Sequence, residues 1–224
     1  MGFLKTLGKI ALAKGVGFLK SAVRKGAEEA GEAVDYVEFG RYPQTAEGGV
    51  RPVEWQVLAR ENNKALVISR YVLDKRRFDP ESNDWSESEI RRWLNDEFYN
   101  SIFSDKEKAR IISFNQDNVF LLSRKEAEKY FANSDARRCS PTAYARAKGA
   151  LEMYDFWWLR SPNPYNSNCV YYVNHDGGID SLDYVDGNSG SVRPALWINL
   201  KKGLLWDTMM VCVGLRNRAM RLHS

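Results

Sequence analysis

The hydrophobic pattern predicts short strands near both ends of the chain. The candidate segments are rich in β-branched and aromatic residues and are separated by turn residues. Polar residues 61–64 between two of them predict a hairpin, and Gly177-Gly178 marks another turn. The predicted strands are residues 36–42, 53–58, 65–69, 119–122, 156–161, 170–173 and 192–200.

The middle of the chain has the periodicity of helices. Ser86 precedes Glu89 by three residues, the spacing of a capping box, so we expect a helix to begin there. Its apolar face is predicted to consist of Ile90, Trp93, Leu94, Phe98 and Ile102. Further helices are expected at 104–107, 125–131 and 142–150. This order, with helices grouped between strand-rich ends, predicts an α+β fold.

Residues 1–34 differ from the rest in charge. Up to residue 25 there are six Lys and Arg residues and no acid, and apolar residues recur at roughly helical spacing. Five glycines weaken this basic amphipathic helix. Three roles stay open for residues 1–27: contact with a membrane surface, pairing with a partner helix, or a leader without fixed structure. Lysines interrupt each apolar stretch, so we expect neither a signal peptide nor a membrane-spanning helix, and a cytoplasmic or membrane-peripheral location.

Composition and motifs argue against an enzyme. The chain is 44% apolar and 28% charged, as in a folded protein, and its net charge of +4 is too small to indicate nucleic acid. The three cysteines form no CxxC pair, so neither a disulfide framework nor a zinc site is expected. The only histidines, His175 in a Gly/Asp-rich turn and His223 beside the last residue, are not placed like catalytic bases. We therefore expect no catalytic residue, metal or cofactor.

Residues 163–191, here called the polar segment, have an unusual composition. They contain no Lys, Arg, Glu, Gln, Met or Trp, and Tyr, Asn, Ser, Asp and Gly dominate. Tyrosine offers a large, stiff contact surface, and small polar residues offer adaptable hydrogen bonds, which is the composition of an antibody-like binding surface. A turn-rich solvated loop has similar small polar residues, so composition alone leaves both interpretations open.

The sequences on either side of the polar segment carry a family resemblance. FWWLRSP at 156–162 and VRPALWI at 192–198 enclose it, and further matches are FGRYPQ at 39–44, VEWQVL at 53–58 and IRRWLN at 90–95. This order resembles the DUF6273 family, bacterial domains of unknown function with a C-type-lectin-like fold. The resemblance covers about residues 36–200. It implies a ligand-binding domain over 35–200, a variable region at about 157–196 and a C-terminal extension over 201–224.

Some family members resemble variable proteins of diversity-generating retroelements, found in bacteria and phages. There an error-prone reverse transcriptase randomises adenines, and the resulting codons cannot encode Lys, Glu, Gln, Met or Trp. The resemblance thus implies a cause for the composition of the polar segment. It implies a macromolecular ligand, protein or glycan, bound by Tyr165, Asn166, Ser167, Asn168, Tyr171, Asn174, His175, Asp180, Ser181, Asp183, Tyr184, Asp186, Asn188 and Ser189.

A rigid scaffold must hold such a surface. We assign to it Trp157, Trp158, Arg160, Arg193, Pro194 and Trp197, and expect both arginines to be partly buried against carboxylates or backbone carbonyls.

Asn163 departs from the family, which commonly has Gly there, so an ordinary lectin-like module without diversification stays open. Two further alternatives stay open. One is a calcium site formed by Asp176, Asp180, Asp183 and Asp186, in place of metal-free binding. The other is a formylglycine-generating-like oxidase that uses two of the cysteines Cys139, Cys169 and Cys212.

Overall fold

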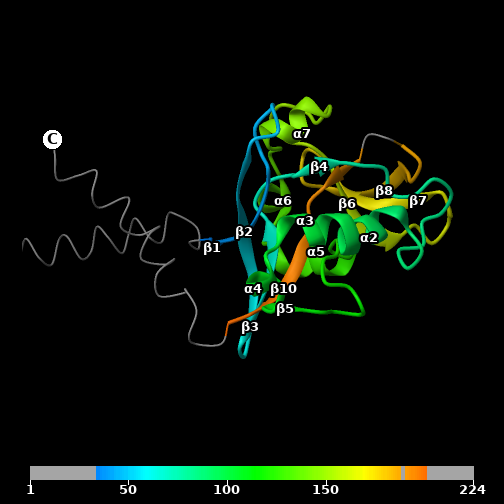
Figure 1. The fold of residues 1–224 in the computed structure, drawn as a ribbon. Helices are drawn as coiled ribbons and strands as arrows, with labels where there is room; N and C mark the ends of the chain where they lie inside the picture. The colour runs from blue at the N-terminus through cyan, green and yellow to red at the C-terminus, as the bar shows by residue number, and fades with distance from the viewer. Residues whose placement is uncertain (1–33, 188–189, 201–224) are drawn as a thin grey trace, which may run out of the picture. The chain divides into compact units, whose positions relative to one another are not determined.

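The computed structural model describes residues 34–187 and 190–200, and these form an α+β fold, as predicted (Figure 1). Two five-stranded sheets are present. The first is antiparallel and consists, in spatial order, of β1 (Tyr36–Pro43), β2 (Val50–Glu61), β3 (Lys64–Ser69), β10 (Ala195–Asn199) and β5 (Ile111–Ile112). The predicted hairpin joins β2 and β3, with Asn62 in the left-handed conformation (φ 53°) that a tight turn requires.

The second sheet contains the strands of the polar segment. It consists, in spatial order, of β4 (Asp74–Lys75), β9 (Ser191–Val192), β6 (Trp157–Pro162), β7 (Cys169–Val173) and β8 (Ile179–Tyr184). β6 and β9 are parallel and the other pairs are antiparallel. β8 is an edge strand, so one side of the polar segment borders no other strand of this sheet.

Short helices lie between the strands in the chain. They are α2 (Glu89–Trp93), the π-helical turn η1 (Leu94–Phe98), α3 (Tyr99–Ile102), α4 (Asp105–Lys108), α5 (Arg124–Tyr130), α6 (Ser134–Arg137) and α7 (Ala143–Ala147). All five residues of the predicted apolar face, from Ile90 to Ile102, are buried. The predicted cap was wrong: Ser88 caps α2 by accepting from the Arg91 amide, while Ser86 donates its hydroxyl proton to Asp84.

Two predicted strands differ from the structure. Residues 119–122 make a single bridge, Phe120 to Ala195, and no strand. Residues 192–200 are split between β9 in the second sheet and β10 in the first. Pro194 lies between the two, where its missing N–H and fixed φ suit a chain that leaves one ladder and enters another. The Arg193-Pro194 pair therefore joins the two sheets.

β6 separates two hydrophobic cores. Its neighbouring tryptophans point to opposite faces, as the two-residue period of a strand requires. Trp158 belongs to the core that contains Trp55, Phe78 and Phe98, and Trp157 to the core around Phe120. Both indoles are fully buried, so this strand has no solvent-facing side at its start. No helix in the described residues is long and apolar enough to cross a membrane.

Candidate binding surface

Twelve of the fourteen predicted ligand-binding residues are described, and none of them is buried. Asn188 and Ser189 lie outside the described residues. Tyr165 is 96% exposed and Tyr184 is 58% exposed, which is far from the usual burial of large aromatic residues. The other exposed members are Asn166, Ser167, Asn168, His175, Asp180 and Asp186, and the half-buried ones are Tyr171, Asn174, Ser181 and Asp183.

Two asparagine amides shape the loop between β6 and β7. The Asn163 side chain accepts from the Tyr165 and Asn166 amides (2.8 and 3.2 Å) and donates to the Ser181 carbonyl (2.7 Å). Asn83, distant in sequence, donates to the carbonyls of Asn163, Asn166 and Cys169 at 2.8–3.1 Å. Backbone groups that a loop would leave to water are thus satisfied by fixed side chains. The loop presents Tyr165 from an ordered base.

We expect Asn163→Ala to loosen this loop without unfolding the protein. The substitution removes the acceptor of two amides and a donor to β8, with a loss of stability of about 1–2 kcal/mol. Hydrogen exchange at the Tyr165 and Asn166 amides should accelerate, whereas Ser167→Ala, which removes an exposed hydroxyl from the same loop, should leave it unchanged. Equal exchange rates in both variants would show that the loop does not depend on Asn163.

The β7–β8 hairpin holds its tyrosines in different ways. Tyr171 is half-buried, and its hydroxyl accepts from Arg124 Nη1 at 2.9 Å. Tyr172 faces the other side and packs edge-on against Phe156, with ring centroids 5.7 Å apart. Tyr184, at the end of β8, has no such cover. Tyr165 and Tyr184 are therefore the tyrosines most available to a ligand, and Tyr171 is partly structural.

Helix α6 supports the turn of this hairpin. Arg137 Nε donates to the Gly177 carbonyl at 2.8 Å, and Arg138 Nε donates to the Asp176 carbonyl at 3.1 Å. Gly177 has φ +84°, and a Cβ there would lie 1.8 Å from the Ser134 carbonyl oxygen. The turn thus requires glycine at this position. The neighbouring His175 is exposed and its Nδ1 contacts the Asn174 side chain.

A cleft of about 270 Å³ opens at the end of β8. Three predicted ligand-binding residues line it, Asn168, Tyr184 and Asp186. Pro80, Glu81 and Val185 complete the walls, so a segment far away in sequence forms one side. Residues of the polar segment and of the 80–81 segment thus form this cleft together.

The described aspartates of the polar segment do not converge on a metal site. Among the described residues no group of three or more His, Cys, Asp or Glu side chains is placed to hold an ion. Burial raises the pKa of Asp183, and the Tyr184 amide and Lys75 oppose this. Asp176 and Asp180 instead accept from the backbone amides of Gly178 and Ser181. Asp176 lies in the β7–β8 turn and Asp180 in β8, and each carboxylate is engaged by a neighbouring amide, so the calcium alternative gains no support.

The cysteines give the oxidase alternative no support either. Cys139 and Cys169 are both buried and unpaired, and Cys212 lies outside the described residues. Burial raises the pKa of both thiols. A raised pKa disfavours the thiolate that redox chemistry needs.

Comparison with known proteins places the chain in a family. The family model "Domain of unknown function (DUF6273)" matches residues 62–118 and 114–200, together more than half of the chain. The chain belongs to the DUF6273 family. A search of curated proteins and one of solved structures found no match. The DUF6273 match includes the whole second sheet and the polar segment, and it begins directly after the end of β2.

The DUF6273 match also contains the arginines that we assigned to the scaffold. Arg160 is half-buried and forms an ion pair with Glu126 (2.7 Å) while donating to the Leu121 carbonyl. Arg193 is buried, donates to the Ser69 carbonyl (2.9 Å) and lies over the Trp157 ring at 5.0 Å. Burial lowers the pKa of Arg193. Trp157, Trp158, Pro194 and Trp197 are buried as well.

Two residues important for the surface were missed from sequence. Asn83 lies in a polar stretch with no periodicity, and its three carbonyl partners are 80 or more residues away. Gly190 was not singled out from sequence, although a Cβ there would lie 1.7 Å from the Trp158 indole. In the sequence, the neighbouring large residues Trp157 and Trp158 were the signal that some backbone segment must pack closely against an indole.

Proposed function

We propose that this DUF6273 protein is a ligand-binding protein with a C-type-lectin-like scaffold, and that a retroelement diversifies its C-terminal surface. The observation that carries the proposal is the division within residues 157–197. Every described residue that we assigned to the ligand is exposed or half-buried. The tryptophans and Pro194 on both sides are buried. Such a division allows the surface to change while the fold persists.

Composition supports the same proposal. The six residue types absent from 163–191 include all five that randomised asparagine codons cannot encode. Tyrosine at exposed positions supplies contact area at low entropic cost, and tyrosines are frequent binding hot spots. The adenine-randomising mechanism is tested by the gene's surroundings. We expect an adjacent reverse transcriptase and a template repeat with adenines at the exposed positions; a gene neighbourhood without them would leave only an ordinary binding module.

The ligand-binding role predicts the effect of removing two tyrosines. Tyr165→Ala with Tyr184→Ala should weaken binding of a ligand captured from cell-surface extracts by about 100-fold or more, since each hot-spot aromatic contributes 2 kcal/mol or more. The melting temperature should stay within about 2 °C of the parent because both rings are exposed. Biolayer interferometry and calorimetry measure the two quantities.

The matched control for the tyrosine variant is Met153→Ala. Met153 is exposed and lies outside the polar segment. It should change neither binding nor stability. Unfolding of the double tyrosine variant would show that those rings belong to the core. Unchanged binding would show that the ligand binds elsewhere on the protein.

The proposed role of residues 1–27, contact with a membrane surface or a partner helix, concerns residues outside the described ones. Replacing their six cations with Gln in the full chain should abolish salt-sensitive co-sedimentation with anionic liposomes if a membrane is the target. Equal sedimentation of both proteins would exclude the membrane and leave a partner helix or a leader without fixed structure.

A further inference from the structure

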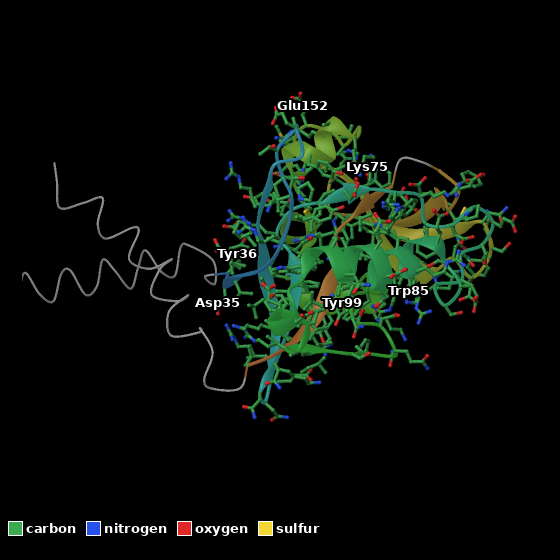
Figure 2. The ribbon with its side chains drawn as sticks, in the orientation of Figure 1. Asp35, Tyr36, Lys75, Trp85, Tyr99 and Glu152 are labelled. Atoms are coloured by element: carbon green, nitrogen blue, oxygen red, sulfur yellow. The ribbon has the colours of Figure 1, made fainter. Side chains whose placement is uncertain are left out.

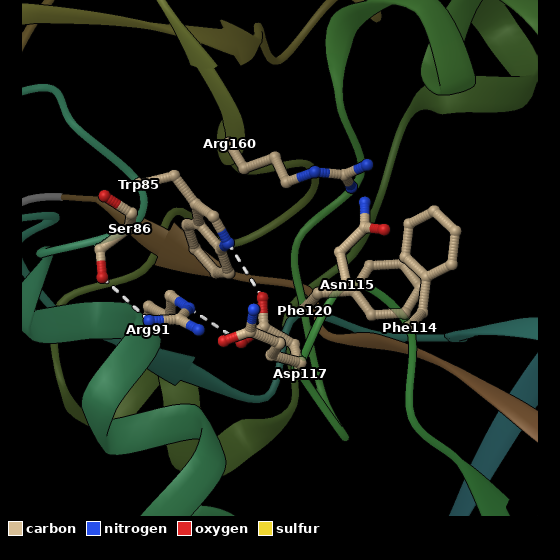
Figure 3. Close-up of a pocket in the computed structure, with 9 residues that line it drawn as sticks. Trp85, Ser86, Arg91, Phe114, Asn115, Asp117, Phe120 and Arg160 are labelled. Carbon is tan, nitrogen blue, oxygen red and sulfur yellow. Dashed lines mark hydrogen bonds and ion pairs between the residues drawn. The ribbon is translucent and has the colours of Figure 1, made fainter.

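A second cleft, of about 180 Å³, lies between α2, the 114–117 turn and β6 (Figure 3). Its walls are aromatic and cationic. Trp85, Phe114 and Phe120 provide ring surface, and Arg91 and Arg160 provide two guanidinium groups. Ser86, Asn115, Gln116 and Asp117 complete the lining. Apart from Arg160, all of these residues precede the region proposed to vary, so the cleft is independent of the proposed function.

Internal contacts hold the polar wall of this cleft rigid. Asp117 is buried and accepts from Trp85 Nε1 at 2.9 Å and from Arg91 Nε at 2.7 Å (Figure 3). Asn95 adds a third, longer contact to the same carboxylate at 3.4 Å. The carboxylate is therefore occupied from within the protein and offers little to a ligand. Trp85, also labelled in Figure 2, is fixed by the same contact.

The rim of the cleft is a tight two-residue turn. The Phe114 and Asp117 backbones exchange hydrogen bonds at 2.8 and 3.0 Å. Asn115 and Gln116 both have positive φ, 49° and 71°, as a type I′ turn requires. Both are exposed, and within the described part of the chain their side chains have no hydrogen-bond partner. Two amide groups are thus held at the opening without a structural task.

The free groups of the cleft are mainly donors. Arg160 uses Nη1 and Nη2 on Leu121 and Glu126, and Arg91 uses Nε and Nη1 on Asp117 and Ser86. Arg160 Nε and Arg91 Nη2 have no partner among the described residues. Glu126, the ion-pair partner of Arg160, does not line the cleft. The charged groups that do line it are two cations, Arg91 and Arg160, and one anion, Asp117. The wall therefore favours a negative group.

From this arrangement we propose that the cleft binds a carboxylate carried on a ring, with the ring against Trp85 and Phe114 and the carboxylate facing the two arginines. The cleft volume of about 180 Å³ is below the range of most ligand sites, so we expect a ligand with a single ring. A sugar acid and an aromatic acid share this chemistry. The carboxylate of the ligand accepts hydrogen bonds from the unused guanidinium and amide N–H groups, and the ring of the ligand covers apolar surface of the cleft.

Titration of the full chain with benzoate and with glucuronate tests the proposal. Benzyl alcohol and glucose are the neutral controls. The Trp85 indole N–H resonance, measured by ¹⁵N NMR, should shift with at least one acid at a Kd of about 1 mM, and each neutral control should bind at least about tenfold more weakly. The two acids distinguish a sugar source from an aromatic one. Equal binding of acid and neutral control, or no shift with either acid, would overturn the proposal.

Substitutions at the exposed rim residue Gln116 test the charge directly. Gln116→Glu should raise the Kd of the acid about fivefold and Gln116→Lys should lower it about threefold, with less difference at high salt. Tyr184→Ala, which alters the other cleft, should leave this Kd unchanged. The same Kd in both Gln116 variants would refute carboxylate binding at this site, whatever the fate of the proposed function.

Discussion

Gly190→Ala should unfold the protein or destabilise it by about 3 kcal/mol or more, the upper range for overpacking a core. A Cβ at this position would lie 1.7 Å from Cε2 and Nε1 of the Trp158 indole. The indole cannot retreat, because its Nε1 donates to the Arg76 carbonyl at 2.9 Å and the ring is fully buried. Urea denaturation measures the loss.

Gly178→Ala is the matched control in the same segment. The nearest atom to a Cβ there is the Asp176 carboxylate at 3.0 Å, the end of an exposed side chain that can rotate away. We expect a change within about 1 kcal/mol. If Gly190→Ala were as stable as Gly178→Ala, the close contact between Gly190 and Trp158 would not exist in solution.

Arg193→Leu should cost about 3 kcal/mol or more of unfolding free energy. Arg193 lies where the chain passes from the second sheet to the first, and its guanidinium donates to Ser69 in β3 and Gln56 in β2. The leucine side chain keeps much of the apolar contact with Trp157 but leaves those buried acceptors without a donor.

Arg92→Leu controls for the chemical change itself. Arg92 is exposed on α2, so its replacement should shift the melting temperature by no more than about 2 °C. Arg193→Leu, by contrast, should lower it by about 8 °C or more. An unchanged melting temperature in Arg193→Leu would show that the crossing between the sheets does not depend on this side chain.

Local pattern was enough to predict the α+β class, the β2–β3 hairpin and the buried face of the central helical run. In those regions periodicity and turn residues agree with the tertiary structure. The segment after residue 191 was different: its unbroken apolar run predicted one strand, yet β9 and β10 belong to separate sheets. Periodicity cannot reveal which ladder each half joins, although Pro194 marked the break.

Placement of the surface followed a similar course. Exposure of Tyr165 could be expected from its neighbours in sequence, because Asn166, Ser167 and Asn168 follow it, whereas Tyr184 is flanked by Asp183 and the apolar Val185. The residues that hold the surface in place could not. Asn83 and α6 hold the polar segment through hydrogen bonds to its backbone carbonyls. Every residue has such a carbonyl, so the sequence does not indicate which ones accept these bonds.

A saturation scan of residues 163–191, scored by resistance to protease, tests the central claim most directly. Tyr165, Asn166, His175, Asp180 and Tyr184 should accept nearly every residue, because their side chains are exposed. Val170, Val173, Gly177 and Gly190 should accept few, because they are buried or lie against neighbouring groups. Equal tolerance in both sets, or intolerance at the exposed tyrosines, would contradict a fixed frame that carries a replaceable surface.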